Sequence, residues 1–509
     1  MNRFQLISLI IVIISGLFVS SCIDDNTTMA TGELPEVSVD TTGIGEPTVL
    51  QFEELELTPE VTLNGISESN VSYKWEVNIA PRDTSFNVIG TEQTLNYKAS
   101  LLPSELDDPY QLVFTVTDEE NEVDYITEFS LHIRNSLGEG LVVANTADRS
   151  NTDLDLIMSP QVTTDYDEIS VKYEVYSSVN TNEIAGIVKD IQFTTIYGEN
   201  ALLAITDQSI VRIKRQDFTF QGINQDLFFA HDPQFSPQFL GKINQGTIYV
   251  GNNELTGTFL GASKRFGAPF DYPYIVPDQV ALNGGSNVPI AINFYDEEND
   301  HFVYLPSIMS FGDNAMYPVP DSTGAEFNPG DLPNKENVAA GIAQNGNFRH
   351  ILRDTNTGNL ALYTLTGGAP FPNAEPPKVL DYYDMSNAPN IENAEYFAIS
   401  DNQQVLYYAT STTIYAMIYG SSTPVFEERF TVSSGEEITT LQVYQQTGYP
   451  RASEYIETNN RQLIVSTYDG SEGKVHLLPI VNLGVGNIDE ANITTFGGFD
   501  RITAIAPQQ

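Results

Sequence analysis

Five histidines and several runs of acidic residues are the side chains of this chain that could bind a metal or transfer a proton. The histidines lie far apart, and none stands in an HxH or HExxH spacing, so the sequence holds no zinc motif. No stretch matches GxSxG, a phosphate-binding loop or GxGxxG. We therefore expect no catalytic residues, no metal site and no cofactor. Carboxylates assembled from distant parts of the chain would leave no such motif, so an enzyme stays the alternative.

Two acidic runs could in principle hold a cation. Residues 296–300 (DEEND) and 118–121 (DEEN) offer oxygen ligands of the kind that Ca²⁺ prefers. Neither has the alternating spacing or the central glycine of a dedicated calcium loop. Each run stands between two strand-like segments, which favours a solvated hairpin turn over a cation site.

Residues 265–274 (RFGAPFDYPY) form a different kind of segment. It holds four aromatic residues and two prolines and has no strand-like alternation. Aromatic rings on a loop supply rigid surface for stacking on sugars or peptides. We therefore take four residues as candidates for binding a ligand or partner: Phe266, Phe270, Tyr272 and Tyr274. The alternative is a loop that folds back over its domain as a plug.

Composition limits the classes of partner. The 509 residues include 68 acidic and 23 basic side chains, for a formal net charge of −45. A chain this acidic repels nucleic acid, so we expect no nucleic-acid partner. Hydrophobic residues make up 41% and aromatic residues 11%, which is enough to build packed cores. The acidity could also attract cations, but solubility is the simpler interpretation.

The elements expected from residue patterning are β-strands throughout. Residues 71–77, 93–99, 110–116 and 127–133 alternate apolar and polar side chains, with turn signals between them. About 100 residues of this kind, over 33–136, predict an immunoglobulin-like β-sandwich with the only tryptophan, Trp75, in its core. Tyr73-x-Trp75 followed by Tyr110-x-Leu112-x-Phe114-x-Val116-Thr117-Asp118 resembles the polycystic-kidney-disease (PKD) pattern. The glycine that usually follows is absent, so the resemblance is to the divergent PKD-like group, which implies a spacer or interaction module without catalysis.

Residues 138–509 repeat a strand–turn–strand pattern every 40–50 residues, as in 189–216, 394–420 and 461–481. Repeats of this length predict a β-propeller of about seven blades. The run 496–506 has the pattern of an inner strand with no blade after it. Residues 140–158 have the pattern of a hairpin that lacks an inner strand. Joining the two would close the ring and leave no exposed inner edge. A second set of β-sandwiches is the alternative.

Cys22 is the only cysteine, and it follows a basic residue, an apolar run over 4–19 and Val19-Ser20-Ser21. This arrangement resembles a bacterial lipobox, which implies removal of the signal peptide 1–21 and acylation of Cys22. An ordinary secretory signal is the alternative. Residues 22–32 would form a tether. Asp24 and Asp25 resemble the surface-export signal of Bacteroidetes lipoproteins, so we expect an outer-membrane protein that faces the exterior, the periplasmic leaflet being the alternative.

An acylated tether, a PKD-like sandwich and a propeller together resemble the PKD-like lipoproteins of Bacteroidetes that accompany Sus-type outer-membrane transporters. That resemblance implies a non-catalytic surface protein that binds a glycan or peptide ligand, or scaffolds a transporter and its lipoprotein lid. The alternative is a surface enzyme that degrades polysaccharide or peptide at a site on the propeller axis.

Overall fold

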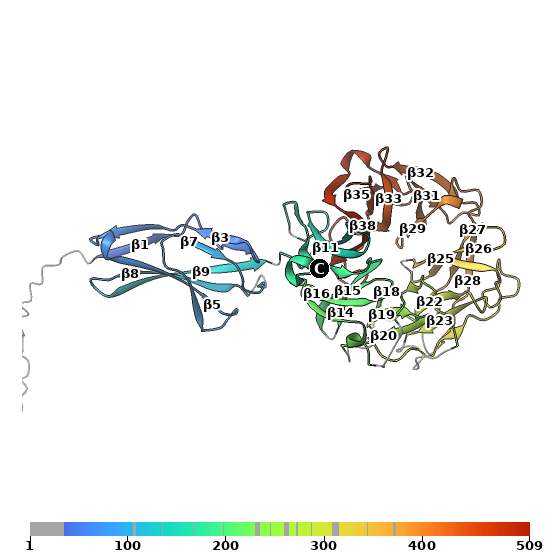
Figure 1. The fold of residues 1–509 in the computed structure, drawn as a ribbon, viewed down its shortest axis with the longest axis horizontal. Helices are drawn as coiled ribbons and strands as arrows, with labels where there is room; N and C mark the ends of the chain where they lie inside the picture. The colour runs from blue at the N-terminus through green and yellow to red at the C-terminus, as the bar shows by residue number, and fades with distance from the viewer. Residues whose placement is uncertain are drawn as a thin grey trace, which may run out of the picture. The chain divides into compact units, whose positions relative to one another are not determined.

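The fold is given by a computed structural model (Figure 1). The chain divides into two compact units, Met1–Ser136 and Leu137–Gln509, each of which makes most of its contacts within itself. The signal peptide, Cys22, Asp24 and Asp25 lie outside the described residues, so the predictions for them stay predictions. The structure describes residues 35–104, 108–134, 136–164, 166–196, 198–229, 235–244, 246–258, 264–270, 273–286, 288–307, 315–343, 345–369 and 373–508.

The first unit is a β-sandwich, as the alternating pattern predicts. One sheet has the order β2(Thr48–Leu50), β9(Val123–Arg134), β8(Tyr110–Asp118), β5(Val71–Asn78) and β6(Phe86–Gly90). The opposite layer pairs β1(Glu36–Asp40) with β4(Glu60–Asn64), and β3(Glu54–Leu57) with β7(Leu95–Lys98). Apolar side chains from both layers share one core.

Trp75 lies at the centre of that core. Its side chain is fully buried, its ring centroid is 4.4 Å from that of Phe114, and its indole N–H donates to the carbonyl of Glu92 at 3.1 Å. Because side chains alternate along a strand, Trp75 and Val77 on β5 face inward with Leu112 on β8. The expected anchoring role of Trp75 is confirmed.

The second unit is a ring of seven sheets among the residues that the structure describes (Figure 1). Blades 1 to 7 follow the chain order, and each is named from its inner strand outward. Blade 1 is β38(Arg501–Gln508), β10(Gly140–Thr146), β11(Asn151–Met158) and β12(Ser170–Lys172), with β13(Ile184–Ala185) also on β11. Blade 2 is β14(Asp190–Ile196), β15(Glu199–Ile205), β16(Ile210–Lys214) and β17(Phe220–Ile223), and blade 3 is β18(Pro237–Ile243), β19(Gly246–Gly251) and β20(Glu254–Gly257).

The remaining four blades complete the ring. Blade 4 is β21(Ala281–Leu282), β22(Ile290–Asp296), β23(His301–Pro306) and β24(Tyr317–Pro318), and blade 5 is β25(Lys335–Ile342), β26(Phe348–Asp354), β27(Leu360–Leu365) and β28(Val379–Asp384). Blade 6 is β29(Tyr396–Ile399), β30(Val405–Ala409), β31(Thr413–Ile418) and β32(Val425–Thr431). Blade 7 is β33(Glu437–Val443), β34(Gln462–Tyr468) and β35(Gly473–Val481), with β36(Asn487–Ile488) and β37(Thr494–Phe499) both paired to β35.

The ring closes through its inner strands. Each contacts the next in the order β38, β14, β18, β21, β25, β29, β33 and back to β38. β38 pairs antiparallel with β10 from Gly140 opposite Gln508 to Thr146 opposite Arg501. The expected closure is therefore confirmed, with one correction. The run 496–506 is two strands, because β37 stays in blade 7 and only β38, after Asp500, crosses into blade 1.

Helical structure is limited to short turns in the described residues. They are α2(Val175–Asn180) and the 3₁₀ turns η1(Glu68–Asn70), η2(Asn224–Leu227), η4(Ile391–Asn393) and η5(Glu490–Asn492). None of these helices has the length and apolar character needed to cross a membrane. The all-β prediction is confirmed.

Candidate functional site

A cavity of about 490 Å³ lies where the seven inner strands converge. Every inner strand contributes at least one residue to its wall, and this size lies within the ~300–1,000 Å³ typical of small-molecule sites. Glycine keeps the inner strands close here, because a Cβ added to Gly241 would stand 2.0 Å from the Leu282 side chain of blade 4. We call this space the axial cavity.

Residues 444–461, between β33 and β34, supply another part of the wall and are called the crossing loop here. Several side-chain bonds attach this loop to other blades. The Lys242 ammonium donates to the Thr447 carbonyl at 3.0 Å, and the Arg451 guanidinium donates to Asn244 Oδ1 at 2.9 Å. Gln446 Nε2 donates to Thr164 Oγ1 at 3.2 Å. The crossing loop, which belongs to blade 7, is thereby fixed to the end of β18 in blade 3 and to the β11–β12 connection in blade 1.

Lys242 is the cation of the axial cavity. It projects near the end of β18, and its ammonium lies 5.5 Å from the centroid of the Phe193 ring. Burial, together with the positive charge of Arg451, lowers the pKa of Lys242 to about 8. Within the described part of the chain, neither cation has a carboxylate at ion-pair distance.

Asp401, just after β29 in blade 6, is the carboxylate of the axial cavity. Burial raises the pKa of its carboxyl group, although bonds from the Tyr449 hydroxyl and Gln445 on the crossing loop oppose the shift. Its Oδ1 atom is buried and has no hydrogen-bond partner among the described residues. A buried acceptor without a donor is costly, so an unpaired oxygen in a cavity wall indicates a place for a ligand hydroxyl or a water molecule.

Asp401 also lines an adjoining pocket of about 460 Å³ between blades 5 and 6. Arg349 donates from its buried guanidinium to the Ser400 carbonyl at 2.6 Å and lies 5.2 Å from the centroid of the Tyr419 ring. The Tyr419 hydroxyl is a second buried polar atom without a partner in the described structure. Amide side chains complete the lining, namely Asn345, Asn402, Gln403 and Gln404.

The aromatic segment 265–274 is divided by the structure. Phe266 is 1% exposed and packs against Phe228, with ring centroids 5.0 Å apart, so it belongs to the core between blades 2 and 3. Phe270 and Tyr274 are half-buried against the core of blades 3 and 4, and Tyr272 lies outside the described residues. The backbone N–H of Phe270 bonds to the Leu255 carbonyl on β20, which among the described residues is the edge strand of blade 3. These contacts favour a structural part for the segment, and its role in binding stays a prediction.

The acidic runs form turns. Asp296 accepts bonds from the backbone N–H groups of Glu298 and Asn299, both at 3.1 Å, and from the Asn299 side chain at 2.8 Å. Asp118 accepts the same three kinds of bond from Glu120 and Asn121. Each turn thus uses the aspartate oxygens internally, as the hairpin interpretation requires. Among the described residues, no three histidine, cysteine or acidic side chains are placed to hold a metal ion.

Two of the histidines, His350 and His476, have structural positions. His350 is fully buried, its Nε2 atom lies 2.7 Å from Asn293 Oδ1, and burial lowers its pKa to about 3. It is therefore a neutral core residue between blades 4 and 5. His476 lies between the hydroxyls of Thr467 and Thr495, each 2.9 Å away.

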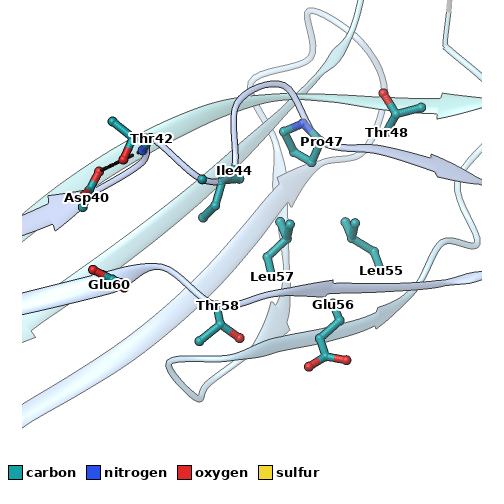
Figure 2. A pocket seen from close by; sticks show the side chains of 11 residues that line it. Asp40, Thr42, Ile44, Pro47, Thr48, Leu55, Glu56, Leu57, Thr58 and Glu60 are labelled. Carbon is teal, nitrogen blue, oxygen red and sulfur yellow. Dashed lines mark hydrogen bonds between the residues drawn. The ribbon is translucent and has the colours of Figure 1, made fainter.

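A separate groove of about 520 Å³ lies in the β-sandwich (Figure 2). Figure 2 shows Leu55 and Leu57 pointing toward Ile44 and Pro47, while Glu56 points away from them. None of its lining residues has a buried polar atom without a partner. The axial cavity, which has such an atom and an unneutralised cation, is the stronger candidate for a functional site.

Comparison with known proteins identifies the N-terminal part. Residues 22–187 match the model of the PKD-like family. The match covers the β-sandwich and continues through the strands β10 to β13 of blade 1. The PKD-like assignment of the N-terminal domain is thereby confirmed. No curated protein matches the chain.

Solved structures resemble the chain distantly. A quinonprotein alcohol dehydrogenase-like protein from Bacteroides thetaiotaomicron shares 13% identity over 94% of this chain and 99% of its own, with a TM-score of 0.41. PorZ, a surface component of the type-IX secretion system of Porphyromonas gingivalis, shares 12% over 71% of this chain and 46% of its own, with a TM-score of 0.34. The β-propeller domain of Cps50 (Swd1) from Myceliophteria thermophila shares 10% over 55% of this chain and 93% of its own, with a TM-score of 0.28.

Proposed function

We propose that this protein is a non-catalytic, lipid-anchored surface protein that binds a polar ligand, a glycan or a peptide, in the axial cavity of its propeller. The observation that carries the proposal is the combination of Lys242, unneutralised by any described carboxylate, with Asp401 Oδ1, buried and unpaired, in one cavity. A buried charge without a counter-charge and a buried acceptor without a donor each cost stability, so their presence together is explained by a ligand that supplies both.

A blocked cavity tests the proposal. Gln442 lines the axial cavity from β33, whereas Gln208 is exposed in the β15–β16 turn. We expect Gln442→Trp to weaken retention of glycans or peptides from a binding panel at least about tenfold, and the control Gln208→Trp to leave it unchanged. Equal retention by both variants would place binding elsewhere.

The anchor and the partner complete the proposal. Cys22 would be acylated, Asp24 and Asp25 would direct the protein to the outer face of the outer membrane, and a Sus-type transporter with its lipoprotein lid would be the partner. The lone cysteine after an apolar run and Val-Ser-Ser supports this. A palmitate analogue should label the wild type and not Cys22→Ser, and the same wild-type protein should pull down the transporter from native membranes.

An enzyme of the propeller axis is the second candidate, and the pKa of Lys242 favours it. A lysine with a pKa of about 8 is partly neutral in mildly alkaline solution, where it could remove a proton from a polysaccharide, as a lyase requires. Hydrolysis by paired carboxylates is less favoured, because Asp401 is the one carboxylate among the residues that line the axial cavity. Product release from the panel, scored separately from retention, distinguishes an enzyme from a binding protein.

A further inference from the structure

We propose that the axial cavity recognises an acidic sugar, a uronic acid residue of a glycan, through a carboxylate contact to Lys242 in the cavity wall, with the exposed Arg451 on the crossing loop adding a second positive charge. This inference rests on the proposed function and adds the chemical class of the ligand. The two residues are called the cationic pair below.

The cationic pair is fixed in position by neutral acceptors. Lys242 donates to the Thr447 carbonyl and Arg451 to the Asn244 side-chain amide, and neither bond cancels a charge. Another lysine on an inner strand has a counter-charge, because Lys335 at the start of β25 lies 2.5 Å from an Asp354 carboxylate oxygen. In a chain with 68 acidic residues, two neighbouring cations without a described carboxylate partner form an unusual site.

Electrostatics favours an anion between the two cations. Lys242 is largely removed from water and lies close enough to Arg451 for the positive charge of Arg451 to lower its pKa. A bound carboxylate would interact with both cations and replace part of the hydration that Lys242 has lost. The net charge of the chain repels anions at long range, but salt screens that repulsion beyond about 8 Å at physiological ionic strength. Recognition of an anion here therefore depends on contact with the pair.

The other side of the axial cavity is lined by groups that can form hydrogen bonds with hydroxyl groups. Asp401 lies in blade 6, three places around the ring from Lys242 in blade 3, and its unpaired Oδ1 needs a hydrogen-bond donor. Amide side chains between them, Gln192, Gln442 and Gln445, both donate and accept. A sugar ring with one carboxylate and several hydroxyls can satisfy the cations and the acid together. A peptide C-terminus brings the carboxylate without the array of hydroxyls, so the acidic sugar is the better match.

Matched ligands test the inference on the wild-type protein. The probes are trimers of galacturonate, of mannuronate and of guluronate, each compared with its methyl ester, and a peptide with a free or an amidated C-terminus. We expect calorimetry to detect at least one uronate trimer and to show its ester binding at least about tenfold more weakly. Equal affinity for acid and ester, or binding of the ester alone, overturns the acidic-sugar inference and leaves the proposed function standing. Binding of the free peptide alone overturns the acidic-sugar inference as well. If the protein binds neither these probes nor any glycan or peptide of the panel, the inference and the proposed function are both overturned.

Variants then assign the contact. Lys242→Met should weaken binding of the acidic trimer at least about tenfold and Arg451→Gln by a smaller factor, and each should weaken binding of the ester less than binding of the acid. Lys189→Met is the matched control, because Lys189 is exposed and pairs with Asp207 at 3.2 Å, away from the cavity lining. Loss of acid and ester binding to the same extent would show that the pair shapes the cavity and does not contact the carboxylate. An unchanged affinity for the acid in both variants would also refute the contact.

Discussion

Removing β38 tests whether the propeller is held closed by its last strand. A chain that ends at Asp500 loses seven paired positions along β10, from Gly140 to Thr146. It also loses Ile502 and Ile505, which are 1% and 7% exposed and pack in the cluster that contains Leu141. The deletion therefore removes both the backbone partners of β10 and part of the apolar core of blade 1.

The size of the effect follows from those two side chains. Truncating one buried isoleucine to alanine costs about 2–5 kcal/mol, so the pair amounts to about 4–10 kcal/mol before any backbone bond is counted. A typical domain is stable by only about 5–15 kcal/mol. We therefore expect the truncated chain to be insoluble or to be cut rapidly by protease in blade 1, where the edge of β10 is freed, and in blade 7, where β33 loses its contact with β38.

Calorimetry and limited proteolysis measure the outcome. Ile502→Ala should lower the stability of the propeller by about 2–5 kcal/mol, whereas Thr503→Ala, at a half-buried neighbouring position, should change it by less than about 1 kcal/mol. A soluble truncated chain with the thermal midpoint of the wild type would refute the closure argument.

Three further predictions concern packing and protonation. Trp75→Ala should destabilise the β-sandwich by about 3–5 kcal/mol and leave the calorimetric transition of the propeller in place, because the two units have separate cores. Burial raises the pKa of Asp155 to about 7, so the folded state binds its proton more tightly than the unfolded chain. The resulting stabilisation is present below pH 4 and is lost as the pH rises through 7, so the propeller midpoint should fall between pH 5 and pH 8, and Asp155→Asn should flatten that fall. Phe266→Ala should lower the midpoint of the propeller by an amount that corresponds to about 3–5 kcal/mol, whereas a ring that only contacts ligand would change binding and leave the midpoint unchanged.

The strands of both units could be predicted because their signals are local. Residues 461–481 alternate around a polar turn, and the structure has β34 and β35 there. Closure could be anticipated because the hairpin at 140–158 lacked an inner strand and the run 496–506 had the pattern of an inner strand without further strands of its own blade. The break at Asp500 between β37 and β38 could not be predicted, because apolar residues lie on both sides of it. The two strands differ only in their partners, β35 for β37 and β10 for β38.

The axial cavity could not be predicted, because its residues are spread from Gln192 to Pro507 with no repeating spacing. In the sequence, Lys242 looks like an ordinary polar residue of a strand. Its burial follows from its position where the inner strands converge, which the sequence does not show. Phe266 looked like a loop residue because its neighbours break the strand pattern. Its burial arises from packing on Phe228 and Tyr249, which are distant from it in sequence.

The pairing of β38 with β10 has a consequence for how the protein matures. A polypeptide emerges from the ribosome or a translocon N-terminus first, so β10 becomes available about 360 residues before the strand that completes its sheet. Until residue 508 has emerged, blade 1 presents an unpaired inner edge, and contacts this distant in sequence form slowly. The nascent protein thus passes through an obligatory open form, and we expect chaperones that recognise exposed strand edges to bind during that interval.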